Sequence, residues 1–93
     1  GKLTKKNGDV LEGEFKNGLV DGNVVIHYAD GRRFKGAYHK GKRQGPCIEE
    51  DKNGKRFEGT YRNDVRDGRF VEKDRNGQVT AKGAYENGKR FED

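Results

Sequence analysis

The chain has 93 residues, of which 40% are charged and 28% hydrophobic, and its formal net charge is +5 at pH 7. That length allows one small domain or one array of short units, and so little apolar surface argues against a thick two-layer core. The absence of serine excludes a serine nucleophile, and a single cysteine excludes an internal disulfide and favours a reducing, cytoplasmic setting.

A short repeat organises the chain. Gly8, Gly31, Gly54 and Gly77 are equally spaced along the sequence, and each follows Asn or Asp. Further glycines and aromatic residues recur at fixed distances after them, which is the sequence signature of a repeat array. The fourth copy carries one extra residue and is incomplete, so the predicted units are 8–30, 31–53, 54–76 and 77–93 within a single array over 1–93.

Each unit is predicted to contain two strands. The Asn-Gly or Asp-Gly pair favours a type I′ hairpin turn, because both central residues of that turn need positive φ. A segment of period two follows, such as residues 11–16, then a longer turn over 17–22 and a returning strand over 23–29. The sequence therefore predicts an all-β fold, an antiparallel meander of successive β-hairpins in a single twisted sheet of about seven or eight strands.

A glycine stands between two aromatic residues in the middle of the first strand of a unit. Phe34 and Tyr38 flank Gly36, and Phe57 and Tyr61 flank Gly59. Glycine weakens a strand unless something must approach its backbone closely. We expect a ring from the neighbouring strand to lie against each of these glycines, with stacked rings stabilising the sheet from unit to unit.

These residues resemble MORN repeats (membrane occupation and recognition nexus). The resemblance rests on residues 31–41 with Gly45, and on residues 54–61 with Gly68; it covers residues 8–93. Val24, Cys47 and Phe70 stand where the family usually has a further glycine, and residues 76–89 resemble the MORN variant of bacterial proteins. The resemblance implies a non-catalytic sheet that binds proteins, pairs with itself or contacts anionic lipid.

Two sets of residues are candidates for binding. An aromatic row is the first candidate: core packing is the favoured role of its rings, and a one-layer sheet would also leave part of them open to a protein partner; its members are Phe15, Phe34, Tyr38, Phe57, Tyr61 and Tyr85. A basic set would contact an anionic phospholipid surface, or would simply keep the surface soluble; its members are Lys16, Arg32, Arg33, His39, Lys42, Arg43, Lys55, Arg56 and Arg62. The open edge strands of the predicted sheet also favour self-association.

No enzyme chemistry emerges from the pattern. Comparison between units places Cys47 in an apolar position shared with Val24 and Phe70, which predicts a core thiol. Neither histidine has a partner at ligand spacing, so we expect no metal, and segments that approach a phosphate-binding loop lack its Ser or Thr. We expect no cofactor, no small-molecule substrate and no specific nucleic acid.

Overall fold

The computed structural model describes residues 1–93, all in strands, turns and short connections. It contains no helix, and so no helix that could cross a membrane. Eleven strand segments belong to one sheet: β1 (Lys2–Thr4), β2 (Val10–Lys16), β3 (Leu19–His27), β4 (Arg33–His39), β5 (Lys42–Arg43), β6 (Gly45–Glu50), β7 (Arg56–Arg62), β8 (Val65–Arg66), β9 (Gly68–Lys73), β10 (Val79–Glu86) and β11 (Lys89–Glu92).

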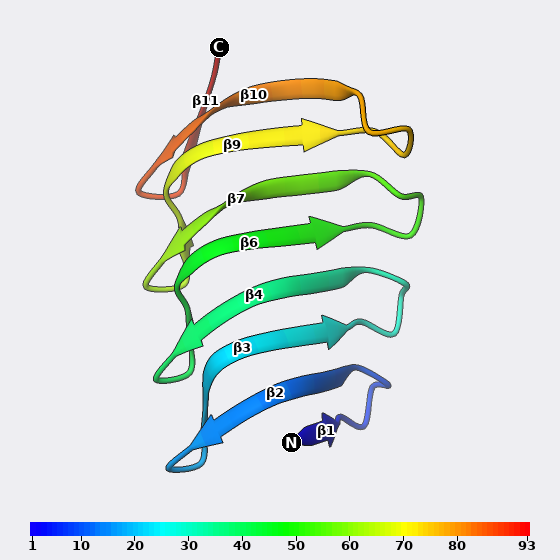
Figure 1. Ribbon diagram of the computed structural model, residues 1–93, viewed down its shortest axis with the longest axis vertical. Helices are drawn as coiled ribbons and strands as arrows, with labels where there is room; N and C mark the ends of the chain where they lie inside the picture. Colours follow the sequence, from blue (N-terminus) through cyan, green and yellow to red (C-terminus); the bar gives the residue numbers. More distant parts are fainter.

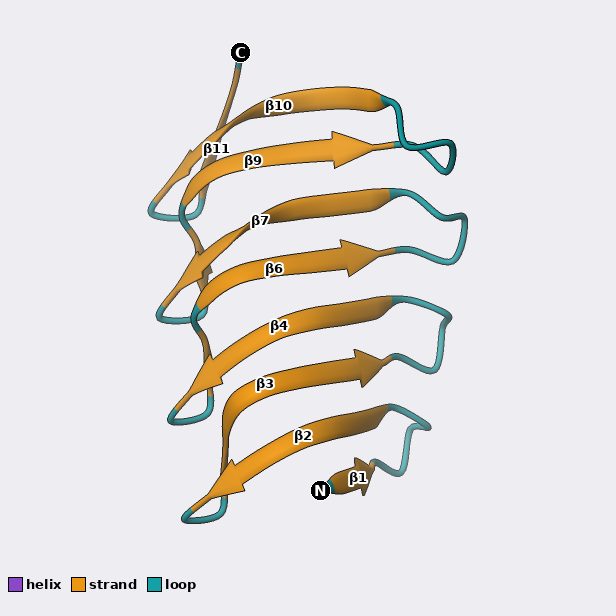
Figure 2. Cartoon of the chain, viewed as in Figure 1, coloured by secondary structure: helices purple, strands orange, loops and turns teal.

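The strands form an open antiparallel meander, as predicted. They follow one another in the order β1-β2-β3-β4-β6-β7-β9-β10-β11 (Figure 1). The short segments β5 and β8 pair with β4 and β7. The predicted seven or eight strands were too few, because β1 lies before the first predicted unit and the strand after each of two turns is interrupted: Gln44 separates β5 from β6, and Asp67 separates β8 from β9. The loops lie at the two ends of the strands, and no second layer covers the sheet (Figure 2).

The predicted turn types are wrong: the type I′ turns lie where the longer turns were expected, and the longer, bulged turns lie where the type I′ turns were expected. At Asp30-Gly31 only Gly31 has positive φ, and its N–H donates to the Tyr28 carbonyl at 3.0 Å. Tyr28 N–H in turn donates to the Arg32 carbonyl at 2.9 Å, as in a type I turn followed by a glycine bulge, which needs one left-handed residue only.

The type I′ turns lie at the other end of the strands. Both central residues have positive φ at Asn17-Gly18 (54° and 80°) and at Asn63-Asp64 (49° and 72°), and Lys40-Gly41 and Asn87-Gly88 are alike. The longer turn predicted over 17–22 is therefore a two-residue turn, and β3 already begins at Leu19.

One face of the sheet carries the core, and we call it the core face; the other is the outer face. Only 11 of 93 residues are buried, as a single layer requires. Phe34 and Phe70 are each 1% exposed. The core consists of Leu11, Val24, Ile26, Phe34, Cys47, Phe57, Tyr61, Phe70 and Tyr85.

The mid-strand glycines do receive rings, but the ring belongs to the same strand in two of the units. A Cβ added at Gly59 would lie 2.7 Å from the Phe57 ring, and one at Gly36 would lie 3.0 Å from the Phe34 ring. Residues two apart on a strand share a face and lean along it, so the ring covers the glycine that follows. The prediction of a ring from the neighbouring strand is therefore wrong at Gly36 and Gly59; such a ring, that of Phe70, lies instead at Gly83.

Candidate functional site

Charged side chains cover the buried rings on the core face. Arg43 and Arg66 occupy the same position of their units, and Arg90 follows one place later because the fourth unit has an extra residue. A glutamate occupies a second shared position in two of the units, as Glu49 and Glu72. Together with the tyrosines that they contact, these residues form what we call the polar lattice: Arg43, Glu49, Tyr61, Arg66, Glu72, Tyr85 and Arg90.

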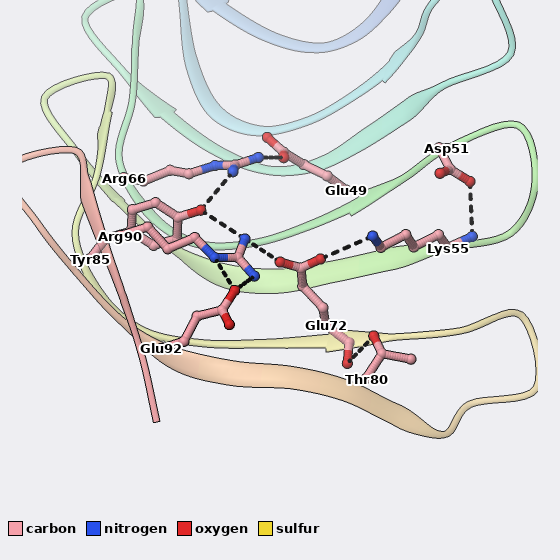
Figure 3. Close-up of polar contacts among 9 residues, drawn as sticks. All are labelled: Glu49, Asp51, Lys55, Arg66, Glu72, Thr80, Tyr85, Arg90 and Glu92. Carbon is pink, nitrogen blue, oxygen red and sulfur yellow. Dashed lines mark hydrogen bonds and ion pairs between the residues drawn. The ribbon is translucent and has the colours of Figure 1, made fainter.

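Arg66 is the centre of the lattice. Its guanidinium lies 4.0 Å from the centre of the Phe57 ring and donates to Glu49 Oε2 at 2.5 Å. It also donates to the hydroxyls of Tyr61 at 3.3 Å and Tyr85 at 3.2 Å. Tyr61 donates its own proton to Glu49 Oε1 at 2.6 Å. Through its bonds to Glu49 and Tyr85, Arg66 joins three successive units (Figure 3).

Arg90 repeats this arrangement one unit later. It stacks on the Phe70 ring at 4.6 Å, pairs with Glu72 and donates to the Tyr85 hydroxyl at 3.3 Å. Glu72 is a buried carboxylate that also lies 3.4 Å from Lys55 Nζ (Figure 3). A carboxylate this buried is stable only when it is paired.

Arg43 has a different partner because the first unit lacks the glutamate. Ile26 occupies that position, and Arg43 instead donates to Asp64 Oδ1 at 2.5 Å while stacking on the Tyr61 ring at 4.4 Å. Asp64 stands where the other units have the glycine of the tight turn. Asp64, which replaces the turn glycine in the third unit, therefore provides the negative charge for Arg43 that Ile26 cannot provide.

The lattice shifts the ionisation of its members. Burial, and then the hydrogen bond to Glu49, raise the pKa of Tyr61 to about 12. Partial burial lowers the pKa of Arg66, but hydrogen bonds to Tyr61 and the charge of Glu49 outweigh burial and raise it above its usual value. The hydrogen bond from Arg43 holds the pKa of Asp64 below its usual value. All three groups keep their ordinary charge at neutral pH.

A hollow of about 340 Å³ opens on the core face. The rings of Phe34, Phe57 and Tyr61 lie at its floor, and six basic side chains and four carboxylates line it. Its rim includes Arg33 and Arg56, which both approach Glu50, at 3.5 and 3.3 Å. The hollow offers charge of both signs, with a basic excess, above an aromatic floor.

The structure separates the six residues of the predicted aromatic row. Phe34, Phe57, Tyr61 and Tyr85 are buried and contact one another or their neighbours in edge-to-face pairs, such as Phe34 with Tyr61 at 6.1 Å. Tyr38 is half-buried against Phe34, at 5.9 Å. Phe15, in the first unit, is 43% exposed. Four of the rings are thus part of the core.

The predicted basic set does not form one bare patch. Seven of the nine residues lie within 4.0 Å of a carboxylate, and the two without such a neighbour are Lys16 and Lys42. Sequence reasoning missed Arg66, Glu49 and Glu72 and treated Arg90 only as a basic turn residue, although an alignment of the units at these two shared positions would have revealed the set. Cys47 is a buried core residue, as predicted, and burial raises its pKa to about 11.

The family model of the MORN repeat matches this chain at residues 12–32, 34–56 and 57–79. The chain belongs to the MORN repeat family. MORN repeats are non-enzymatic repeat modules that are associated with protein or membrane-lipid interaction. A search of curated proteins found no match, and the three MORN units together cover more than two thirds of the residues. The predicted fourth unit lies mostly outside the matched segments, although β10 and β11 extend the same sheet.

Proposed function

We propose that this MORN array is a non-catalytic scaffold, and that a protein segment binds along its core face over the polar lattice. The observation that carries the proposal is the hollow above Phe34, Phe57 and Tyr61, walled by basic and acidic side chains. Arginine and tyrosine are the residues most often found at energetic centres of protein interfaces. Here they are already held in place by Glu49 and by the rings beneath, so a partner would meet a rigid surface.

Site-specific photo-cross-linking in the source cells tests this proposal. A photoreactive residue replaces Arg33 or Arg56 at the rim of the hollow, and Lys6, in the glycine-bulge turn between β1 and β2, serves as the control position. We expect adducts of one discrete mass from positions 33 and 56 and none from position 6. Adducts that are the same from all three positions, or none from the rim, would refute a core-face partner.

The scaffold also associates with itself in this proposal, because a single-layer sheet leaves one whole face without a partner. Sedimentation of the purified chain across the micromolar to millimolar range measures this directly. A monomer–dimer equilibrium is expected, and a monomer at every concentration would refute self-association while leaving the core-face proposal intact.

Contact with anionic phospholipid is a second candidate, and the tight-turn edge of the sheet favours it. The four type I′ turns lie along one side of the sheet (Figure 1). Two exposed aliphatic residues, Leu19 and Val65, lie there among basic ones, although Asp64 and Glu86 share the edge. The basic residues of this edge are Lys16, His39, Lys40, Lys42, Arg62 and Lys89.

A basic residue near an anionic leaflet adds about 1 kcal/mol of affinity. In a flotation assay, the chain should rise with vesicles that contain anionic phospholipid, and less with a Lys16→Glu/Lys42→Glu variant. Equal recovery with neutral vesicles would remove this candidate.

A further inference from the structure

One row of the outer face alternates apolar and charged residues across the whole sheet. The strand register places these residues next to one another in seven consecutive strands, and we call the row the outer stripe: Glu12, Val25, Lys35, Ile48, Glu58, Val71 and Lys82. The apolar members come from the returning strand of each unit, and the charged members come from the first strand. The charge changes sign at each step, from Glu12 to Lys35 to Glu58 to Lys82.

The stripe is open to solvent. Ile48 is 39% exposed, Lys35 is exposed, and Val25 and Val71 are half-buried. The outer face beside it is hollowed by about 830 Å³ over small residues, among them Ala37, Pro46 and Thr60. When two sheets pack face to face they lie about 10 Å apart, and side chains from both fill the space between. The hollow and the stripe together are therefore half of such a layer, without the other half.

When the stripe is read in the reverse direction, every charged position carries the opposite charge and every apolar position stays apolar. Read from either end, Ile48 is the fourth and central residue, and Val25 and Val71 stand two places from it. Inversion about Ile48 places Lys35 opposite Glu58 and Glu12 opposite Lys82. We infer that a second copy of this chain packs on the outer face about a two-fold axis that passes near Ile48 and runs parallel to the strands.

This axis is the one that charge selects. An axis running across the strands would place each residue of the stripe opposite itself, so that Lys35 would meet Lys35 and Glu58 would meet Glu58, which repel. The axis along the strands turns both contacts into opposite-charge pairs and places Ile48 against Ile48. A two-fold interface of this kind uses the same patch on both copies and closes at a dimer.

The neighbouring rows limit how wide the contact is. By register, the next row on the side of the glycine-bulge turns contains Arg33, Glu50, Arg56 and Lys73. Glu50 pairs with both arginines, and these three residues also line the core-face hollow, so they lie at the end of the sheet. These long side chains stay at the solvent margin of the dimer. The row on the other side has small residues at its centre, with Ala37 opposite Thr60 and Pro46 opposite itself. Asn23 and Arg69, which pairs with Asp93, flank them. The contact therefore consists of the stripe and this small-residue row.

The size of the contact predicts a weak dimer. Seven strands about 4.8 Å apart span about 29 Å, and two to three rows of side chains are about 15 Å wide, which gives on the order of 450 Å² per copy. The two copies together would bury about 900 Å², which is below the usual range of specific interfaces, where complexes are transient. Pairing through the sheet edges is less favourable, because β1 has only three residues and β11 carries Lys89 and Arg90. Short strands and charged residues discourage pairing at an edge.

This inference rests on the self-association proposed above and names its surface, so charge reversal can test the two separately. In the Lys35→Glu variant, the new glutamate would lie opposite Glu58 of the other copy, and the two would repel. In the Glu58→Lys variant, the new lysine would lie opposite Lys35 of the other copy, and these would repel as well. We expect each variant to weaken the dimer at least tenfold in sedimentation equilibrium. An equimolar mixture of the two variants, and the double variant K35E/E58K, should dimerise as the parent does.

Lys6→Glu, an equal change of charge in a distant turn, is the control and should leave dimerisation unchanged. Glu58 also lies 3.1 Å from Lys73 of its own chain, so circular dichroism checks that each variant keeps its fold. Ile48→Thr, which keeps a β-branched residue at the predicted axis, should weaken the dimer without an effect on folding. If both single variants dimerise as well as the parent, the outer stripe is not the dimer surface, although self-association stands. If the parent protein is a monomer at every concentration, both proposals are refuted.

Discussion

Replacement of Gly59 by alanine tests whether the ring-over-glycine contact holds the sheet together. The new Cβ would lie 2.7 Å from Cε1 and Cζ of Phe57, about 1 Å closer than carbon atoms normally approach. Phe57 cannot easily move aside, because it stacks on Phe70 at 5.7 Å and lies edge-to-face with Tyr85 at 5.9 Å. The guanidinium of Arg66 covers its other side.

Overpacking of this kind costs about 1–3 kcal/mol, and alanine returns about 0.4–1 kcal/mol by reducing the freedom of the unfolded chain. The net loss in the free energy of unfolding should be about 1–2 kcal/mol, which for a domain of this size lowers Tm by about 5–15 °C. Urea denaturation and calorimetry measure both quantities. Gly59 has no positive φ, so backbone strain does not contribute.

A double-mutant cycle isolates the ring as the cause. In a Phe57→Leu background the side chain no longer reaches over Gly59, so Gly59→Ala should then cost little or nothing. The reasoning would be refuted if Gly59→Ala were as stable as the parent, or if its cost were the same in both backgrounds.

Three further predictions concern the polar lattice and the core thiol. Arg66→Ala should lower the free energy of unfolding by about 1–3 kcal/mol, because Glu49 loses its ion pair. Arg66→Lys should recover only part of that loss. Arg62→Ala is the control, because the Arg62 side chain is 74% exposed, and an equal loss of stability in this variant would count against the role of Arg66. Stability should fall as pH rises from about 10 toward about 12, because the folded state keeps the Tyr61 proton that the unfolded state has released, and Tyr61→Phe should flatten this fall in urea titrations; stability that is constant or rising there would be inconsistent with the lattice. Cys47 should react with an aromatic disulfide reagent at pH 8 only as fast as the chain opens, with urea accelerating it, and an immediate reaction of the native chain would disprove its burial.

The repeat made the architecture predictable from sequence. Glycines at a fixed spacing, with strand segments of period two between them, specified the hairpins, the single sheet and the core face that contains Phe34 and Phe57. The turn types could not be assigned from the Asn-Gly pairs alone, because the same dipeptide forms a tight turn at Asn17-Gly18 and a bulged turn at Asn53-Gly54. Which one forms depends on the register of the flanking strands, a property of the whole sheet.

The site was harder to predict than the fold. The aromatic residues were recognised, but a ring is buried only if something covers it, and the cover is provided by Arg43, Arg66 and Arg90. Each of these arginines looks like an ordinary turn residue until the sheet brings it over a buried ring. Phe15 shows the converse, because no guanidinium lies over its ring, which stays 43% exposed.

The account depends on rings that lie over side-chain-free backbone on one face of the sheet, and proton NMR tests this directly. An aromatic ring shifts protons above its plane upfield, so the α-protons of Gly59 should resonate well upfield of those of the turn glycines, with ring-to-ring nuclear Overhauser effects between Phe34 and Tyr61 and between Phe57 and Tyr85. Gly59 α-protons at an ordinary chemical shift, without those ring-to-ring effects, would contradict the account.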